Sequence, residues 1–187
     1  MDKKTNLVWM DLEMTGLDAN KDTILQVALI ITDKDLNILN KGMDIVIHQP
    51  QEVLDNMNEW CIENHGKSGL TKRVQESTIN MEYAEEMILE ELQKYTIEKK
   101  SPLCGNSVYM DRYFLMKHMP EVNNYLHYRL IDVSTLSELY GRWYPNQPNY
   151  KKQDKHLALE DIEDSINQLK FLKEKIFKET VSFMNGN

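Results

Sequence analysis

The first quarter of the chain alternates between apolar runs and short polar breaks, a pattern that predicts β-strands. Three runs stand out, at residues 6–14, 24–33 and 38–48, and the second, ILQVALIITD, is almost continuously apolar. Such a run predicts a strand buried on both faces of a sheet. The polar stretch DKDLN between the second and third runs predicts a turn. We therefore expect the three strands to form an antiparallel meander.

Beyond Pro50 the apolar residues follow the spacing of amphipathic helices instead. The predicted elements are, in order, one or two short helices over 52–65, a helix over 80–99, a short strand over 103–106, a helix over 109–119 ended by Pro120, a strand over 129–133, a helix capped by Ser134 and running toward Tyr144, and a last helix from about Leu157. The last helix has an apolar stripe of Ile162, Ile166, Leu169, Leu172 and Ile176. Strands followed by helices that alternate with two further strands predict an α/β fold, a mixed five-stranded sheet with helices on both faces.

Length and composition predict one domain over residues 1–187, with a core at about 6–178 and a frayed C-terminal VSFMNGN. No apolar run approaches the length of about 20 residues that a membrane span needs, and MDKKTN lacks the apolar centre of a signal peptide. The two cysteines, Cys61 and Cys104, lie far apart and without metal-like spacing, so we expect reduced thiols. These features favour a cytoplasmic protein with no membrane partner.

The charge balance narrows the classes of partner. The chain carries 22 Lys and Arg residues against 30 Asp and Glu residues, a net charge of −8. Tight binding of long duplex nucleic acid requires many basic side chains to neutralise phosphates, so this charge argues against it. A short single strand with few phosphates and a divalent cation both remain compatible with an acidic chain.

Two acids interrupt the first predicted strand, in the stretch LVWMDLEMTGLD. Asp11 and Glu13 are two residues apart, so both side chains point to one face of the sheet. They could simply be solvated acids on an exposed strand. However, a Gly-containing turn follows at once, which puts the pair near the carboxyl end of the strand, where α/β sheets carry their sites. Two neighbouring carboxylates repel each other unless a cation neutralises them, and hard oxygen ligands favour Mg²⁺ or Mn²⁺.

Further candidate ligands lie in the predicted helices. Asp111 follows a turn of small residues, and Asp161 lies beside the apolar stripe of the last helix, at the boundary of the core. Each could also be an ordinary surface acid, and we expect Glu163 and Asp164 to be solvated. His156 lies five residues before Asp161 and is either structural or exposed, or a base that removes a proton from a metal-bound water.

Taken in order, WMDLEMTGLD, LCGNS with DRYFL, HYRLIDVSTL and HLALEDIEDS resemble the motifs of the DEDDh 3′-to-5′ exonucleases, over about residues 6–178. The resemblance implies a ribonuclease-H-like fold and a metal-dependent hydrolase that releases nucleoside 5′-monophosphates. It also implies that Asp11, Glu13, Asp111 and Asp161 bind two divalent metal ions, Mg²⁺ or Mn²⁺, and that His156 is the general base. Within this family the chain is most similar to the members that degrade the shortest RNAs, of two to five nucleotides.

The resemblance also implies roles in substrate binding. Leu17 would wedge between two bases, and Trp60 and His65 would line the nucleotide pocket, although composition alone favours Trp60 as a helix core residue. Ser107, Arg129, Ser134 and Thr135 would bind the 5′ phosphate of a dinucleotide. His127 and Tyr128 would reach the site of a second subunit in a homodimer, although an aromatic and basic triplet is more often an exposed strand end.

Two alternatives remain open at this point. One is a proofreading or nucleic-acid-trimming exonuclease, against which the compact chain and the expected phosphate site argue. The other is a non-catalytic nucleotide-binding domain on the same fold, against which the complete set of four acids and His156 argues. The chain departs from the family pattern at VYM, residues 108–110, and at QDK, residues 153–155, which changes the expected rim of the pocket and leaves every expected ligand in place.

Overall fold

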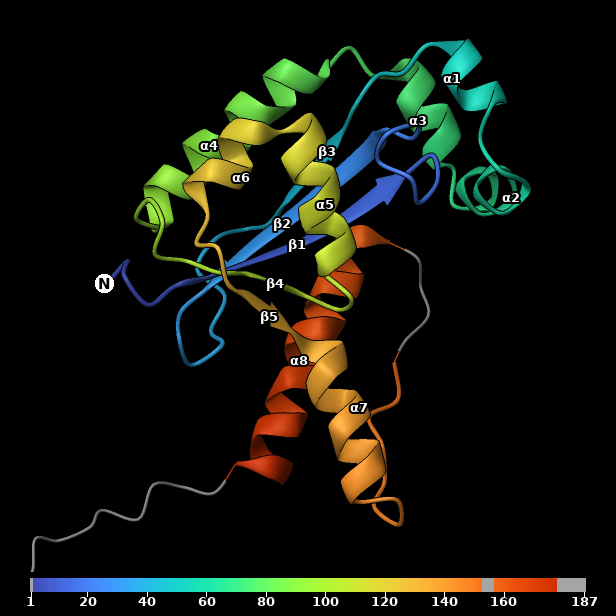
Figure 1. Ribbon diagram of the computed structural model, residues 1–187. Coiled ribbons are helices and arrows are strands. Elements are labelled where there is room, and N and C mark those ends of the chain that lie inside the picture. Colours follow the sequence, from blue (N-terminus) through green and yellow to red (C-terminus); the bar gives the residue numbers. More distant parts are fainter. Residues whose placement is uncertain (1, 153–156, 178–187) are drawn as a thin grey trace, which may run out of the picture.

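A mixed five-stranded sheet forms the centre of the molecule in the computed structural model, which describes residues 2–152 and 157–177 (Figure 1). The strand order is β3-β2-β1-β4-β5. The strands are β1 (Leu7–Met14), β2 (Ile24–Thr32), β3 (Met43–Val46), β4 (Leu103–Gly105) and β5 (Leu130–Asp132). β1, β2 and β3 pair antiparallel, and β4 and β5 continue the sheet parallel to β1. The predicted meander and the predicted α/β fold are therefore confirmed.

Helices cover both faces of this sheet. They are α1 (Gln51–Asp55), α2 (Glu59–Lys67), α3 (Leu70–Glu76), α4 (Met81–Tyr95), α5 (Tyr109–His118), α6 (Pro120–Tyr125), α7 (Val133–Trp143) and α8 (Ala158–Ile176). Figure 1 shows α4, α5 and α6 over one face, α7 and α8 over the other, and α1, α2 and α3 grouped beyond the carboxyl end of β1. Within the described residues, no helix is long and apolar enough to cross a membrane.

The alternation of β1 divides the core into two layers. Val8, Met10 and Leu12 pack with α4 and α5, and Trp9 packs on the opposite face with the buried stripe of α8. By the period of two, Asp11 and Glu13 share the face of Trp9 and therefore point toward α8. β2 is buried along its whole length, as its continuous apolar run predicts. Both cysteines are buried free thiols, which confirms the expectation of reduced cysteines.

The third strand is shorter than predicted, because a side chain replaces backbone pairing before it. Asn40 accepts a hydrogen bond from the backbone N–H of Ile31 through its Oδ1 at 2.8 Å. Gly42 then takes a left-handed conformation, with φ of +79°, that interrupts the extended chain. Only an isolated bridge between Thr32 and Ile38 remains of the first half of the predicted strand.

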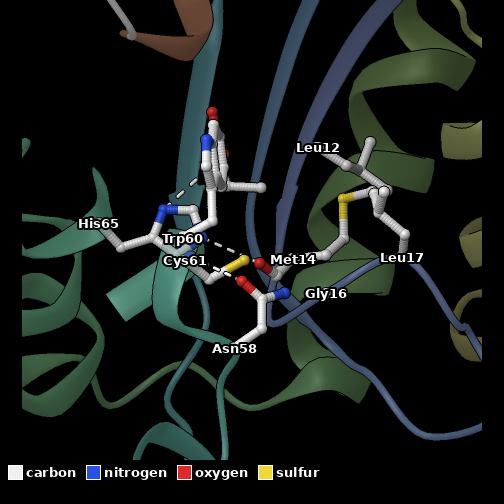
Figure 2. Close-up of a pocket in the computed structure, with 9 residues that line it drawn as sticks. Leu12, Met14, Gly16, Leu17, Asn58, Trp60, Cys61 and His65 are labelled. Atoms are coloured by element: carbon white, nitrogen blue, oxygen red, sulfur yellow. Dashed lines mark hydrogen bonds and ion pairs between the residues drawn. The ribbon is translucent and has the colours of Figure 1, made fainter. Parts of the chain in front are cut away.

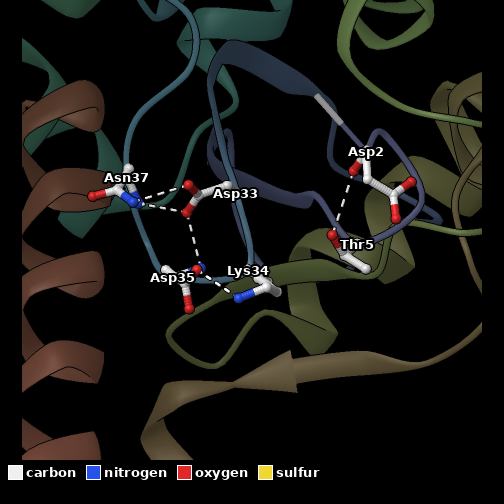
Figure 3. A network of polar contacts seen from close by, with 6 residues as sticks. All are labelled: Asp2, Thr5, Asp33, Lys34, Asp35 and Asn37. Atoms are coloured by element: carbon white, nitrogen blue, oxygen red, sulfur yellow. Dashed lines mark hydrogen bonds and ion pairs between the residues drawn. The ribbon is translucent and has the colours of Figure 1, made fainter.

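The turn between β2 and this bridge is held by one carboxylate. Figure 3 shows Asp33 facing Asn37, whose backbone N–H and side-chain amide both donate to it at 2.9 Å. These hydrogen bonds hold the pKa of Asp33 below its usual value. The predicted turn at DKDLN is therefore confirmed, and it is an Asp-centred turn of the kind that replaces backbone ladder bonds.

Sequence reasoning missed two helices and misplaced one cap. α3 and α6 are too short to show a periodic stripe, and Pro120, predicted only to end a helix, is also the first residue of α6. The N-cap of α7 is Asp132, whose carboxylate accepts the N–H of Ser134 at 3.0 Å, so the prediction that Ser134 is the cap was wrong. Either residue type satisfies an N-terminal donor, and β5 ends one residue earlier than expected.

A buried acid in α8 binds Tyr150, which lies in the described part of the chain after α7. Asp164 is buried, and its Oδ1 accepts the hydroxyl of Tyr150 at 2.7 Å. The expectation that Asp164 is solvated was therefore wrong, whereas Glu163 is exposed as expected. Burial and the carboxylate together raise the pKa of Tyr150 to about 12, so its hydroxyl keeps its proton and remains a donor at neutral pH. The predicted His156 and residues 153–155 lie outside the described residues.

Candidate active site

Two acids on β1 form the first part of the site. Burial raises the pKa of Asp11 to about 8, and the charges of Glu13 and Asp161 add to this rise. Burial also raises the pKa of Glu13 to about 7, with further contributions from Asp161 and Asp111. Each acid is therefore held where its charged form is disfavoured by both desolvation and like charge. Such perturbed groups mark a functional site more often than a structural one.

Asp111 joins them from the opposite layer of the fold. It lies in the first turn of α5, it is buried, and its Oδ1 accepts the backbone N–H of Leu12 at 2.9 Å. Leu12 stands between the two acids of β1, so this bond ties Asp111 directly to the acidic stretch. Burial raises the pKa of Asp111 to about 8, and Asp11 is the largest charged contributor, which places the two carboxylates within mutual influence.

Asp161 completes the group from the first turn of α8. Its backbone N–H donates to the carbonyl of Leu157 at 2.9 Å, and its charge raises the pKa of both Asp11 and Glu13. The four acids that the sequence analysis selected, from β1, α5 and α8, thus lie near enough for their charges to affect one another's pKa. The remaining predicted member, His156, lies outside the part of the chain that the structure describes.

The chemistry of these side chains fits hard divalent cations. Four carboxylates on one site supply oxygen ligands and carry the charge of two divalent ions. Among residues 2–152 and 157–177, no group of three or more His, Cys, Asp or Glu side chains converges closely enough to hold a metal ion as placed.

A cavity of about 470 Å³ opens beside Glu13, between the end of β1 and α2. Its lining consists of Leu12, Glu13, Met14, Gly16, Leu17, Asn58, Trp60, Cys61 and His65. Figure 2 shows Leu17 and the Trp60 ring on opposite sides of it. Leu17 is 70% exposed and Trp60 is 63% exposed, so the interpretation of Trp60 as a helix core residue was wrong. Two exposed apolar side chains that flank a cavity are suited to stack on a planar ring.

His65 connects this cavity to the acids. Its Nε2 donates to the carbonyl of Met14 at 2.9 Å, and its Nδ1 lies 3.9 Å from Oε2 of Glu13. Its ring meets Trp60 edge-on, with 6.5 Å between centroids. Burial lowers the pKa of His65, so the ring is neutral at neutral pH. His65 therefore orients the wall of the cavity next to Glu13.

The turn that carries Leu17 is built around Asp22, a residue that sequence reasoning missed. The Asp22 carboxylate accepts the hydroxyl of Thr15 at 3.0 Å and the N–H of Asp18 at 2.9 Å, so it closes the turn on both sides of Leu17. A Cβ at Gly16 would clash with this carboxylate, so the turn requires glycine there. The sequence signal was an Asp and a Thr flanking a glycine turn, which marks a side-chain-closed loop.

A second polar group lies at the carboxyl ends of β4 and β5. The N–H of Ser107 donates to Oγ of Ser134 at 2.9 Å and to Oδ1 of Asp132 at 3.0 Å, and Ser107 has a left-handed φ of +51°. Thr135 follows Ser134 in the first turn of α7 and is exposed. The structure therefore brings Ser107, Ser134 and Thr135 together at the start of α7, where the helix dipole favours an anion.

Arg129 does not join that group within one chain. It precedes the first residue of β5, whereas Ser134 follows the last. Its Nε donates to the hydroxyl of Tyr128 at 3.1 Å, and its guanidinium lies over the Tyr128 ring, 5.4 Å from the centroid. The ring of His127 stacks on the same tyrosine at 4.5 Å. These three residues form an aromatic and basic cluster at the other end of the strand, in which Tyr128 and Arg129 are exposed and His127 is half-buried.

The sequence of the chain places it in an exonuclease family. A sequence model of the exonuclease family matches residues 8–169. The structure also superposes on that of Escherichia coli exonuclease I in complex with an oligonucleotide, with a TM-score of 0.72 at 16% identity over 92% of this chain and 41% of that one. Because this identity is low, the superposition shows the shared fold alone.

The sequence comparisons narrow the class further. The chain is 53% identical to a probable oligoribonuclease of Dictyostelium discoideum, over 95% of this chain and 93% of that protein. It is 51% identical to a mitochondrial oligoribonuclease of Homo sapiens, over 94% and 75%, and 49% identical to an oligoribonuclease of Pseudomonas aeruginosa, over 95% and 99%. The chain therefore belongs to the oligoribonuclease family.

The raised pKa values predict how the acids affect stability. A carboxylate whose pKa is higher in the folded than in the unfolded protein stabilises the fold at low pH, and that contribution is lost as the pH rises through the folded value. In EDTA, wild-type stability should fall between about pH 4 and pH 8, the range spanned by the Asp11 values. Asp11→Asn should be more stable than wild type at pH 8.5, by on the order of 2 kcal/mol, and no more stable at pH 4.

Denaturant unfolding of both proteins at the two pH values measures this effect. Asp55→Asn changes an exposed acid in the same way and serves as the control, with no such gain expected. A less stable Asp11→Asn protein at pH 8.5 would show that the cluster is not electrostatically strained. Addition of Mg²⁺ or Mn²⁺ should stabilise the wild type more than Asp11→Asn, since the variant lacks one ligand.

Proposed function

We propose that this protein is a divalent-metal-dependent 3′-to-5′ exoribonuclease that hydrolyses RNA of two to five nucleotides, dinucleotides above all, to nucleoside 5′-monophosphates. The observation that carries the proposal is that Glu13 both lines the Leu17–Trp60 cavity and belongs to the group of buried acids, whose charges raise its pKa. Membership of the oligoribonuclease family supports the same activity.

The cavity would bind the 3′-terminal base. Its volume of about 470 Å³ is within the usual range for small-molecule sites. Trp60 would stack on the base and Leu17 would separate it from the next one, with stacking on such side chains contributing about 1–3 kcal/mol per base. The neutral His65 ring would close the wall beside Glu13. A base held there would leave its 5′-side phosphate next to the acids.

Asp11, Glu13, Asp111 and Asp161 would hold two Mg²⁺ or Mn²⁺ ions. When bound, these ions lower the pKa of an attacking water and stabilise the charge on the leaving oxygen. The hydrogen bond from Leu12 to Asp111 keeps that carboxylate oriented toward β1 before any cation binds. His156 is our candidate for the base that accepts the water proton, and this role stays a prediction.

The serine group would limit the length of the substrate. The hydroxyls of Ser107 and Thr135, which lie beside Ser134 at the start of α7, would donate to a terminal 5′ phosphate. A substrate whose 5′ phosphate is held there cannot extend further in that direction. We also propose a single exonuclease domain over residues 1–187, in a cytoplasmic protein.

We further propose a homodimer, in which Arg129, His127 and Tyr128 of one subunit complete the phosphate site of the other. Arg129 lies at the end of β5 opposite Ser134 within its own chain, and Tyr128 is 74% exposed. Light scattering at micromolar concentration should give twice the mass of the 22.1 kDa chain. A monomeric mass at that concentration would rule this arrangement out.

The activity is tested with 5′-labelled RNAs of two to twenty nucleotides, with and without EDTA. The dinucleotide should be hydrolysed fastest, the twenty-mer slowest, and EDTA should abolish both reactions. Trp60→Ala should raise KM for the dinucleotide about 5- to 100-fold through the lost stacking.

Trp143→Ala is the matched control, because Trp143 is 62% exposed and lies on α7, outside the lining of the cavity. It should leave KM unchanged. Equal rates on the dinucleotide and the twenty-mer would contradict the length limit, and full activity in EDTA would contradict the role of metal ions.

A further inference from the structure

The side chain of Asn106 has no role in the site described above, yet it is held from three directions. Its Nδ2 donates to Oγ of Ser165 at 2.7 Å and to Oε1 of Gln168 at 3.1 Å. Its Oδ1 accepts the hydroxyl of Ser134 at 3.1 Å. Ser165 and Gln168 are both buried in α8, so the amide is fixed against that helix. An amide with this many short bonds has one orientation only.

On one side, Asn106 determines the geometry of the serine group. The Ser134 hydroxyl donates its only proton to Asn106, which leaves its lone pairs for the N–H of Ser107. That N–H bond helps to hold Ser107 in its left-handed conformation. A non-glycine residue in this region of φ is strained and persists only where its surroundings fix it. Asn106 therefore sets the shape of the turn through Ser134.

On the other side, Asn106 reaches the helix that carries Asp161. Ser165 donates its hydroxyl to the backbone carbonyl of Asp161 at 2.8 Å, one turn earlier in α8. Gln168 also donates to Oγ of Ser137 in α7 at 3.2 Å, so the same network ties the two helices together. A series of hydrogen bonds thus connects the serine group to the backbone of α8 at Asp161, from Ser134 through Asn106 and Ser165 to the Asp161 carbonyl.

We propose that Asn106 is a positioning residue, which holds the Ser107–Ser134 turn at a fixed distance from the acid cluster so that a 5′ phosphate and the scissile phosphate are bound together. The inference rests on the proposed function. It assigns to Asn106 no contact with substrate; the side chain acts through Ser134 on one side and through α8 on the other. Its loss therefore affects substrates that carry a 5′ phosphate more than substrates that end in a 5′ hydroxyl.

The test compares Asn106→Ala with wild type on two dinucleotides, one 5′-phosphorylated and one with a 5′ hydroxyl. KM for the phosphorylated dinucleotide should rise by up to about tenfold, because the turn that binds the phosphate loses the hydrogen bond that fixes Ser134, and KM for the other should change less than about twofold. Equilibrium binding in EDTA, where no hydrolysis is expected, should show the same selective loss.

Two further variants keep the result interpretable. Ser165→Ala removes one of the two hydrogen bonds that the Asn106 Nδ2 donates. It should raise KM for the phosphorylated dinucleotide by less than Asn106→Ala does, again with little effect on the other dinucleotide. This variant also provides the test if Asn106→Ala does not fold. Asn37→Ala removes the hydrogen bond from the Asn37 side chain to Asp33, in the remote turn of Figure 3. It should leave KM unchanged for both dinucleotides.

The outcomes separate the inference from the function on which it rests. An equal rise in KM for both dinucleotides would show that Asn106 acts only on stability. An unchanged KM for both would show that Asn106 does not position the phosphate site. Either result would overturn the inference. A wild-type protein inactive on both dinucleotides would instead overturn the proposed function.

Discussion

Several carboxylates that repel one another are buried together at the carboxyl end of β1, and the candidate site depends on this electrostatic interaction. Asp11 and Glu13 share one face of β1, Asp111 is held against the strand by the N–H of Leu12, and Asp161 approaches from α8. Burial and like charge together raise the pKa of three of these groups to about 7 or 8. Burial of these like charges costs stability unless a cation compensates it, which supports the metal site proposed for these acids.

The cavity and the serine group lie on elements that surround these acids. The turn closed by Asp22 presents Leu17, and α2 presents Trp60 and His65, so the cavity lies on one side of the acids. The serine group at the ends of β4 and β5 lies at the start of α7, and the Asn106 network connects it to the helix of Asp161. A short substrate needs two anchored ends with a fixed separation, and rigid elements provide that better than a long basic groove.

Much of this could be predicted from periodicity and order along the chain. The continuous apolar run predicted β2, and the apolar stripe predicted α8. The alternation of β1 predicted that Asp11 and Glu13 share one face. Predictions failed where neighbours that are remote in sequence decide the outcome. Asn40 replaces a strand by bonding to Ile31, Tyr150 buries Asp164, and Trp60 is exposed because α2 turns it outward beside a cavity. Asp132 and Ser134 are equally good caps, so only the structure separates them.

The central claim, that the buried acids form a site for divalent cations, is tested most directly by calorimetric titration of the metal-free protein with Mn²⁺ at pH 7 in two buffers of different ionisation enthalpy. The raised pKa values mean that some of these carboxyls are protonated at pH 7 and must lose those protons when a cation binds. We expect two bound ions per chain with net proton release, and greatly weakened binding in Asp11→Asn. Binding without proton release, or equal binding by Asp11→Asn, would contradict it.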